Sequence, residues 1–243
     1  MAARRVSQGA VLAPILRRWL WNGIDLIFPP SCAGCGKPRT RWCFECESKT
    51  ILIKGLTCEI CGLPETRPGI CHRCTANRPV FNQLRSWAVY ADPVRKALLR
   101  LKYSNDVSLS EIFGTKLLEL FLKLRWNVDL VVPVPLGRVR QRQRGYNQSD
   151  LIAQIFAASV GIEYQSEALN RNRETRSQVD LVFSERDKNV RGAFTAAKNS
   201  IEQKRILVID DIATTGATLS ACAYALLSAG AAEVSAITVA RAI

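Results

Sequence analysis

Eight of the nine cysteines lie in four C-x-x-C pairs between Cys32 and Cys74, and this arrangement constrains the fold more than any other feature of the chain. Two intervening residues let both thiolates of a pair approach one ion from a tight turn, and a tetrahedral zinc site needs four such sulfurs. The four pairs therefore predict two closed, structural Zn²⁺ sites. The pairs are Cys32 with Cys35, Cys43 with Cys46, Cys58 with Cys61, and Cys71 with Cys74.

The simplest assignment is sequential, with the first four cysteines around one ion and the last four around another. An interleaved arrangement and an iron–sulfur cluster stay open as alternatives. Thioredoxin-like redox chemistry is disfavoured, because one active C-x-x-C would suffice for it. The single histidine, His72, is surplus to a four-sulfur site and is expected on the surface. A closed site leaves no position for substrate, so we expect this module to be structural or to form a binding surface.

Composition narrows the location and the partners. No stretch approaches the roughly 20 apolar residues that cross a bilayer, and Pro14, Arg17 and Arg18 interrupt the apolar run that a signal peptide would need. We therefore expect a reducing, cytoplasmic location, in which cysteines bind metal rather than form disulfides. The formal net charge of +13 favours polyanionic partners: nucleic acid, phosphorylated metabolites or an anionic membrane surface. A solvated basic face without a partner is the alternative.

Apolar spacing divides the chain into three expected parts. Residues 1–30 form an amphipathic helix that packs on its own protein or lies peripherally at the inner face of the membrane. Residues 31–79 hold the cysteine module, and residues 80–243 alternate strands with helices, which indicates an α/β parallel sheet. A polar, arginine-rich stretch at 170–190 is expected to be a long mobile loop. The expected strands are 84–90, 130–134, 206–209 and 234–240, and the expected helices are 94–101, 109–124, 148–159 and 217–229.

A run of apolar residues from Ile206 leads into two acids, a threonine-rich turn and the start of a helix. Open α/β sheets bind their ligands at the carboxyl ends of such strands. Backbone N–H groups of the turn, together with the amino end of the helix, form an anion site to which threonine hydroxyls add donors. The paired acids conflict with a pure phosphate site, whereas in a sugar phosphate they would accept hydrogen bonds from vicinal hydroxyls. Simple helix capping is the alternative. The residues concerned are Asp210, Asp211, Thr214, Thr215, Gly216 and Thr218.

The segment from Asp210 to Thr218 resembles the ribose-phosphate signature of type I phosphoribosyltransferases. Other segments resemble the ComF family of competence-associated proteins, from about residue 20 onward. They are Leu101-Lys102-Tyr103, Val132-Pro133-Val134-Pro135-Leu136, Arg144-Gly145-Tyr146-Asn147-Gln148 and a double zinc ribbon after Phe28-Pro29-Pro30. One departure is Ser104-Asn105-Asp106, where the family more often has a glycine. The resemblance implies a phosphoribosyltransferase-like parallel sheet behind a small amino-terminal double zinc-ribbon module.

The resemblance also implies roles for particular residues. Asp210 and Asp211 would hold the ribose hydroxyls of phosphoribosyl pyrophosphate, directly or through Mg²⁺, and the stretch from Ala213 to Thr218 would wrap the 5-phosphate. Lys102 and Arg144 would contact the pyrophosphate, and residues 170–190 would form a flap. The phosphate-wrapping residues are Ala213, Thr214, Thr215, Gly216, Ala217 and Thr218. The neighbouring arginines at 138, 140 and 142 are equally consistent with a solvated loop.

Three functions are compatible with these features. The first is phosphoribosyl transfer to an acceptor that no nucleobase-reading residue or general base identifies. The second is binding of single-stranded DNA, with Tyr103 or Tyr146 stacking on bases; the family's link to natural DNA uptake implies a role there. The third is an adaptor whose zinc ribbons dock a partner such as a DNA-uptake helicase or channel protein.

Overall fold

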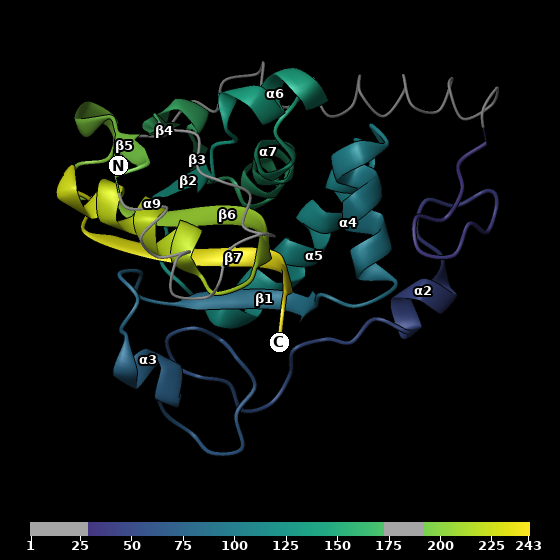
Figure 1. Ribbon diagram of the computed structural model, residues 1–243, viewed down its shortest axis with the longest axis horizontal. Coiled ribbons are helices and arrows are strands. Elements are labelled where there is room, and N and C mark those ends of the chain that lie inside the picture. Colours follow the sequence, from purple (N-terminus) through teal and green to yellow (C-terminus); the bar gives the residue numbers. More distant parts are fainter. Residues whose placement is uncertain (1–28, 173–191) are drawn as a thin grey trace, which may run out of the picture.

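A wholly parallel five-stranded sheet organises the residues that the computed structural model describes, 29–172 and 192–243 (Figure 1). Its strand order is β1-β7-β6-β2-β3. The strands are β1 (Leu84–Val89), β2 (Leu130–Pro133), β3 (Glu163–Tyr164), β6 (Arg205–Ala213) and β7 (Glu233–Arg241). A separate antiparallel hairpin joins β4 (Leu169–Arg171) to β5 (Phe194–Ala196). The predicted phosphoribosyltransferase-like α/β fold is therefore confirmed.

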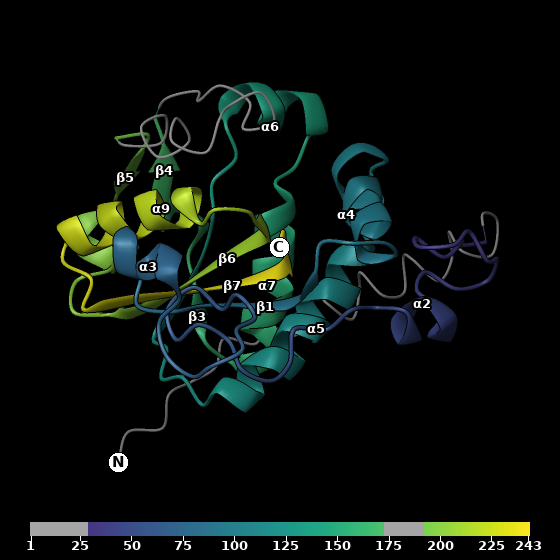
Figure 2. The same cartoon turned by 60° about the horizontal axis from the view of Figure 1, so that its bottom comes forward.

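Helices cover both faces of this sheet. The helices of the domain are α4 (Val94–Tyr103), α5 (Leu109–Leu124), α6 (Arg138–Arg144), α7 (Gln148–Val160) and α9 (Ala217–Ser228), with short 3-10 turns η1 (Ser166–Ala168) and η3 (Lys198–Ser200). Alternate side chains of β6 enter different cores: Val208 packs with α9, whereas Leu207 and Ile209 pack with α4, α5 and α7. Because successive side chains point to opposite faces of the sheet and both faces are covered, the buried strands are continuous apolar runs in the sequence. Figure 2 shows α9 and α5 on opposite sides of the sheet.

Two expectations differ from the structure. The strand predicted to end at Ile209 continues to Ala213, because Ile212 and Ala213 still pair with β7. The arginine-rich loop before Gly145 was wrongly predicted, since residues 138–144 form the short helix α6. Gly145 ends that helix with a φ of +76°, a conformation that glycine adopts without a steric penalty.

Two predicted segments lie outside the described residues: the amphipathic helix over 1–28 and the flap from residue 173 onward. The domain boundaries at residues 30 and 79 stay predictions. In the described ranges, no helix combines the length and the apolarity that crossing a membrane requires.

Two similar zinc ribbons precede the sheet. In each, the first cysteine accepts a backbone hydrogen bond across a tight turn: Gly36 N–H donates to the Cys32 carbonyl at 2.8 Å, and Gly62 N–H to the Cys58 carbonyl at 3.0 Å. Each third cysteine is followed directly by one short helix, α2 (Phe44–Ser48) in the first ribbon and α3 (His72–Ala76) in the second. His72 is exposed, as predicted.

The ribbons contact different parts of the α/β domain. Ribbon 1 (residues 31–50) lies beside α4 and α5, where Arg41 Nε donates to Ser108 Oγ at 2.7 Å and Lys116 pairs with Glu47 at 2.7 Å. Ribbon 2 (residues 56–77) joins the core on the α9 side, and the Leu84 N–H of β1 donates to the Ile60 carbonyl at 2.7 Å. Ribbon 2 is thus packed as part of the domain.

Candidate functional site

The cysteines form two separate groups of four, within each of which all sulfur atoms lie within 4.8 Å of one another. The groups are Cys32, Cys35, Cys43 and Cys46, and Cys58, Cys61, Cys71 and Cys74. Sulfur pairs lie 3.5–3.6 Å apart, for example Cys61 with Cys71. A tetrahedral zinc ion with bonds of about 2.3 Å needs sulfurs about 3.8 Å apart, so both groups fit Zn²⁺. The predicted sequential pairing is confirmed.

Backbone amides prepare the first cysteine of each group to bind metal as a thiolate. Burial raises the pKa of Cys32, but backbone hydrogen bonds from Cys35, Cys43 and Gly34 outweigh it and lower that pKa to about 6. At Cys58, too, backbone hydrogen bonds outweigh the effect of burial and lower the pKa to about 7. Zinc binds the thiolate rather than the thiol, so these amides favour the metal-binding form.

The second site is built around the end of β6, where the predicted acid pair lies. Asp211 is buried, with 5% of its side chain exposed, and it forms an ion pair with Lys102 from the carboxyl end of α4. Lys102 is also largely enclosed, with 16% of its side chain exposed. The structure therefore brings together two residues that lie more than a hundred positions apart in the chain.

Asp210 is held by a hydroxyl donor from the start of α7. Ser149 Oγ donates to Asp210 Oδ1 at 2.7 Å, and the Asp211 N–H donates to the same oxygen at 3.0 Å. Burial and then the neighbouring Asp211 charge raise the pKa of Asp210 to about 7, against the opposing effects of Ser149 and Lys102. The raised pKa means that the ionised form of Asp210 is disfavoured in the free protein, and a bound cation or hydroxyl donor would stabilise that form. Ser149 was not predicted, although it follows directly on the Arg144–Gln148 segment.

The turn after β6 leads directly into the amino end of α9. Ala213 closes the strand, paired with Arg241, so that the turn itself consists of Thr214, Thr215 and Gly216. Gly216 has a φ of +86°, and α9 begins directly after it. Because the first N–H groups of a helix lack partners within the helix, this end attracts anions. Thr215 Oγ1 already accepts from the Ala217 N–H at 3.1 Å.

The segment between α6 and α7 lies against the end of α4. Tyr146 donates its hydroxyl to the Leu101 carbonyl, and Asn147 Nδ2 donates to the Val134 carbonyl at 2.9 Å. Arg144 donates to Gln148 Oε1 at 2.9 Å and stacks over Tyr103 at 4.9 Å. Arg144 is therefore held on the same side of the sheet as Lys102, at the carboxyl ends of the strands.

The turn after α4 contains a residue with left-handed backbone. Asn105, in the segment for which the resemblance implies a glycine, has a φ of +53°. Asparagine tolerates this left-handed region better than most residues, so the turn is kept without glycine. Arg100 then pairs with Asp106 at 2.8 Å and fixes the turn beside ribbon 1.

Family comparisons agree with both parts of the molecule. The double zinc ribbon domain matches residues 23–75, and the phosphoribosyl transferase domain matches residues 118–243. The chain is 33% identical to the DNA utilization protein YhgH of Escherichia coli K12 over 86% of its own length and 96% of that protein.

Two other relatives are named for competence. The chain is 31% identical to competence protein ComFC of Bacillus subtilis, covering 84% of this chain and 86% of that one. The chain belongs to the ComF family. It is 28% identical to competence protein F of Haemophilus influenzae, covering 71% and 78%. Among solved structures, the glutamine phosphoribosylpyrophosphate amidotransferase of B. subtilis matches 54% of this chain and 26% of that one, with 26% identity and a TM-score of 0.38.

Proposed function

We propose that this ComF-family protein binds the ribose 5-phosphate group of phosphoribosyl pyrophosphate at the end of β6 and acts in DNA uptake or DNA handling. The observation that carries the proposal is the convergence of the acid pair, Lys102 and the turn before α9 at one edge of the sheet. The names of the relatives, which refer to competence and DNA utilization, support the cellular part.

Each part of the site suits one part of that ligand. Asp210 and Asp211 would accept hydrogen bonds from the vicinal hydroxyls, and residues 213–218 would enclose the 5-phosphate with amides and threonine hydroxyls. The carboxylate oxygens fit Mg²⁺, which prefers oxygen ligands and keeps substrate phosphates in its shell. When bound, Mg²⁺ would supply positive charge to the pyrophosphate.

Lys102 and Arg144 would neutralise the leaving pyrophosphate if the protein transfers the phosphoribosyl group. In that reaction the bond between C1 of ribose and pyrophosphate breaks, and an acceptor forms the new bond to C1. Both cations lie near the carboxyl end of the sheet, and Arg144 can bind phosphate oxygens in pairs.

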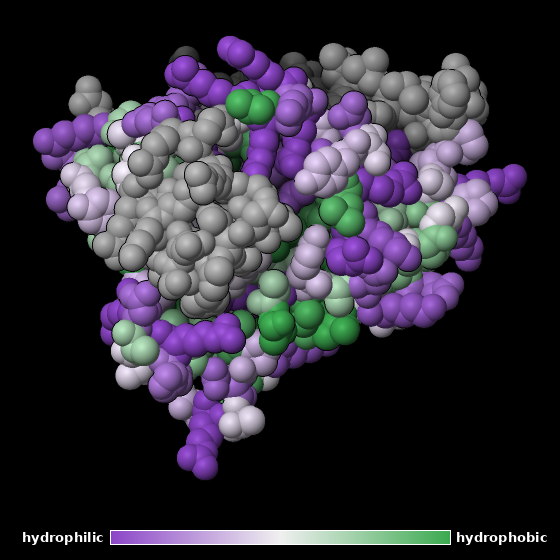
Figure 3. All heavy atoms as spheres, viewed as in Figure 1, coloured by the Kyte–Doolittle hydropathy of each residue, from purple (hydrophilic) through white to green (hydrophobic). Residues whose placement is uncertain are grey.

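Single-stranded DNA binding is the second candidate, and Tyr103 specifically favours it. Tyr103 is 71% exposed, and its ring lies next to the guanidinium of Arg144. None of the α6 residues is buried, so the arginines at 138 and 142 are available to a phosphate backbone. Polar and charged side chains also dominate the described part of the face in Figure 3. If the protein binds single-stranded DNA in this way, the zinc ribbons would dock a helicase or channel protein.

Calorimetry with phosphoribosyl pyrophosphate and Mg²⁺ tests the ligand. The Asp210→Asn, Asp211→Asn double variant should lose binding, whereas Asp129→Asn, an acid at the opposite end of the sheet, should keep it. Equal affinity in wild type and double variant would contradict the assignment. Release of pyrophosphate in a screen of acceptors then tests transfer, and a Tyr103→Ala variant in a salt titration with single-stranded DNA tests the second candidate.

A further inference from the structure

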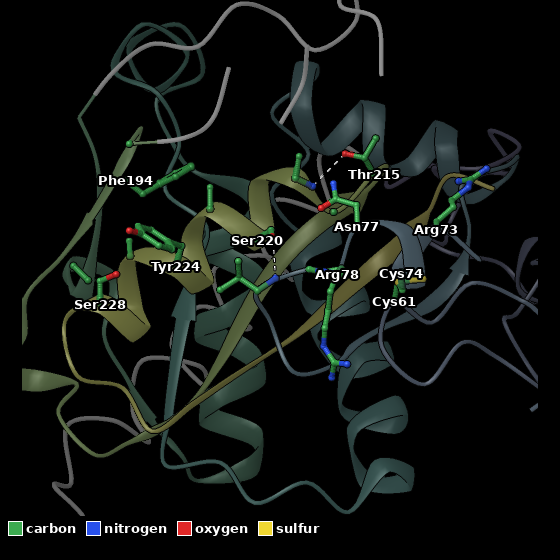
Figure 4. Close-up of a pocket in the computed structure, with 18 of the residues that line it drawn as sticks. Cys61, Arg73, Cys74, Asn77, Arg78, Phe194, Thr215, Ser220, Tyr224 and Ser228 are labelled. Atoms are coloured by element: carbon green, nitrogen blue, oxygen red, sulfur yellow. Dashed lines mark hydrogen bonds between the residues drawn. The ribbon is translucent and has the colours of Figure 1, made fainter. Parts of the chain in front are cut away.

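A cavity of about 870 Å³ lies between ribbon 2, the β4–β5 hairpin and α9 (Figure 4). It is distinct from the acid site, because neither Asp210, Asp211 nor Lys102 lines it. The two share only the wall from Thr215 to Ala217. The cavity has the volume of a small-molecule site, and nothing in the proposed sugar-phosphate function uses it.

One end of the cavity carries positive charge. Arg241, from the last position of β7, borders it and is 2% exposed, and its Nε and Nη1 atoms have no hydrogen-bond partner within residues 29–172 and 192–243. Its Nη1 lies 4.0 Å from the place that a Cβ on Gly216 would take, beside the wall shared with the turn. Buried donors without an acceptor are rare in folded proteins, because each loses its hydration without compensation. These two N–H donors therefore favour a ligand that supplies a hydrogen-bond acceptor.

The zinc thiolates nearby do not remove this preference. A zinc ion with four thiolates carries a net charge of −2. Three arginines line the same cavity: Arg73 from ribbon 2, Arg78 directly after that ribbon, and Arg241 from the sheet. The balance on this side is therefore positive, and an anion is the ligand group that it favours.

The other end of the cavity is apolar and aromatic. Phe194 and Tyr224 lie together there with Ser228, away from Cys61 and Cys74 in Figure 4. Phe194 is buried, whereas Tyr224 is 64% exposed and stands at the rim. The guanidinium of Arg171 lies 5.5 Å from the centre of the Phe194 ring, so the accessible aromatic surface is that of Tyr224. A planar ring can stack on Tyr224 beside Phe194. Between the two ends, the small residues Ala217, Ala221 and Ala225 line the cavity along α9.

We propose that this cavity binds a free nucleoside monophosphate, with the phosphate at the arginine end and the base against Phe194 and Tyr224. The ligand class follows from the combination, because an inorganic anion would leave the aromatic end empty and a neutral ring would leave Arg241 without an acceptor. Since Thr215 to Ala217 form a wall of both sites, the bound nucleotide would contact the turn that receives the sugar phosphate. Binding of the nucleotide does not depend on the proposed function; only the role of this shared wall rests on it.

The test uses the full-length, zinc-loaded chain and dAMP as the probe, measured by calorimetry at low salt. Saturating ribose 5-phosphate with Mg²⁺ is present throughout to occupy the acid site. Wild type should bind dAMP, and Tyr224→Ala should weaken it about tenfold, since one base stacked on an aromatic ring contributes about 1–3 kcal/mol. Tyr224→Ala should leave the weaker binding of inorganic phosphate unchanged.

Charge variants test the other end. Arg78→Ala and Arg241→Gln should weaken dAMP and inorganic phosphate alike by about tenfold, whereas Arg67→Ala, an exposed arginine of ribbon 2 that does not line the cavity, should change neither. Arg78 and Tyr224 are exposed, so their variants report even if Arg241→Gln fails to fold. Absence of dAMP binding, or binding that none of the three variants alters, overturns the proposal. A chain that does not bind ribose 5-phosphate refutes the proposed function and still permits the dAMP measurement.

Discussion

The stability of the Asp210→Asn variant relative to wild type should be higher at pH 8 than at pH 5.5. The pKa of Asp210 is raised from 3.8 to about 7 in the folded chain. A raised carboxyl pKa means that the folded state binds the proton more tightly than the unfolded state. Stability therefore falls as the pH rises from about 4 to 7 and levels off above that. The asparagine amide would keep the acceptor oxygen that Ser149 uses, without the charge.

The magnitude follows from this window. Between pH 5.5 and pH 7 the wild type loses about 1.36 kcal/mol per pH unit, or about 2 kcal/mol in total. For a chain of this size 1 kcal/mol moves the melting temperature by about 2–4 °C, so the advantage of Asp210→Asn should grow by about 4–8 °C between the two pH values. Scanning calorimetry in buffer without Mg²⁺ measures it.

A matched acid provides the control. Asp129 pairs with Arg205 at 2.8 Å, and hydrogen bonds from that arginine lower the pKa of Asp129. Its contribution to stability is present above pH 3.8, so Asp129→Asn should lower the melting temperature equally at pH 5.5 and pH 8. An advantage of Asp210→Asn that does not change with pH would refute the assignment of a raised pKa.

Three further predictions concern the frame around the site. Lys102→Met should lower the free energy of unfolding by about 3 kcal/mol in chemical denaturation, because it leaves the buried Asp211 charge without its partner; an unchanged midpoint would contradict the pairing. Gly62→Ala should destabilise more than Gly36→Ala, although both positions have positive φ, because a Cβ at Gly62 collides with the Leu84 carbonyl and one at Gly36 meets nothing. Metal analysis should give two zinc ions per chain, and chelation should lower the melting temperature; one ion, or a melt that chelation leaves unchanged, would exclude the double ribbon model.

The strand, turn and helix from Ile206 to Thr218 could be predicted because the residues that define them are contiguous. The same holds for the four C-x-x-C pairs. The end of β6 could not be located, since Asp210 and Asp211 interrupt its apolar run, and only the register with Thr238 to Arg241 shows that the strand continues. Helix α6 was missed because it buries no side chain, so no apolar period marks it.

Contacts between residues far apart in the sequence could not be predicted either. The resemblance assigned Lys102 to the polyphosphate, but its ion pair with Asp211 depends on how α4 packs against the sheet. Ser149 carried no signal beyond its position after the Arg144–Gln148 segment. Such pairs follow from tertiary structure, in which residues of no special local pattern acquire a role from their neighbours.

Arg241 shows this most clearly, because no local motif distinguishes it from the other arginines of the chain. The parallel pairing of β7 with both β6 and β1 instead buries it at the sheet end. Burial lowers its pKa, and the nearby thiols of Cys61 and Cys74 oppose that effect. Burial also lowers the pKa of Arg85 of β1, against the opposing thiols of Cys58 and Cys61, although Arg85 donates to the carbonyls of Leu84 and Glu59. A tetrathiolate zinc centre of charge −2 would offset part of the charge of both arginines. Through Arg241, the ribbon would then stabilise the carboxyl end of the sheet, from which the turn of residues 214–216 follows.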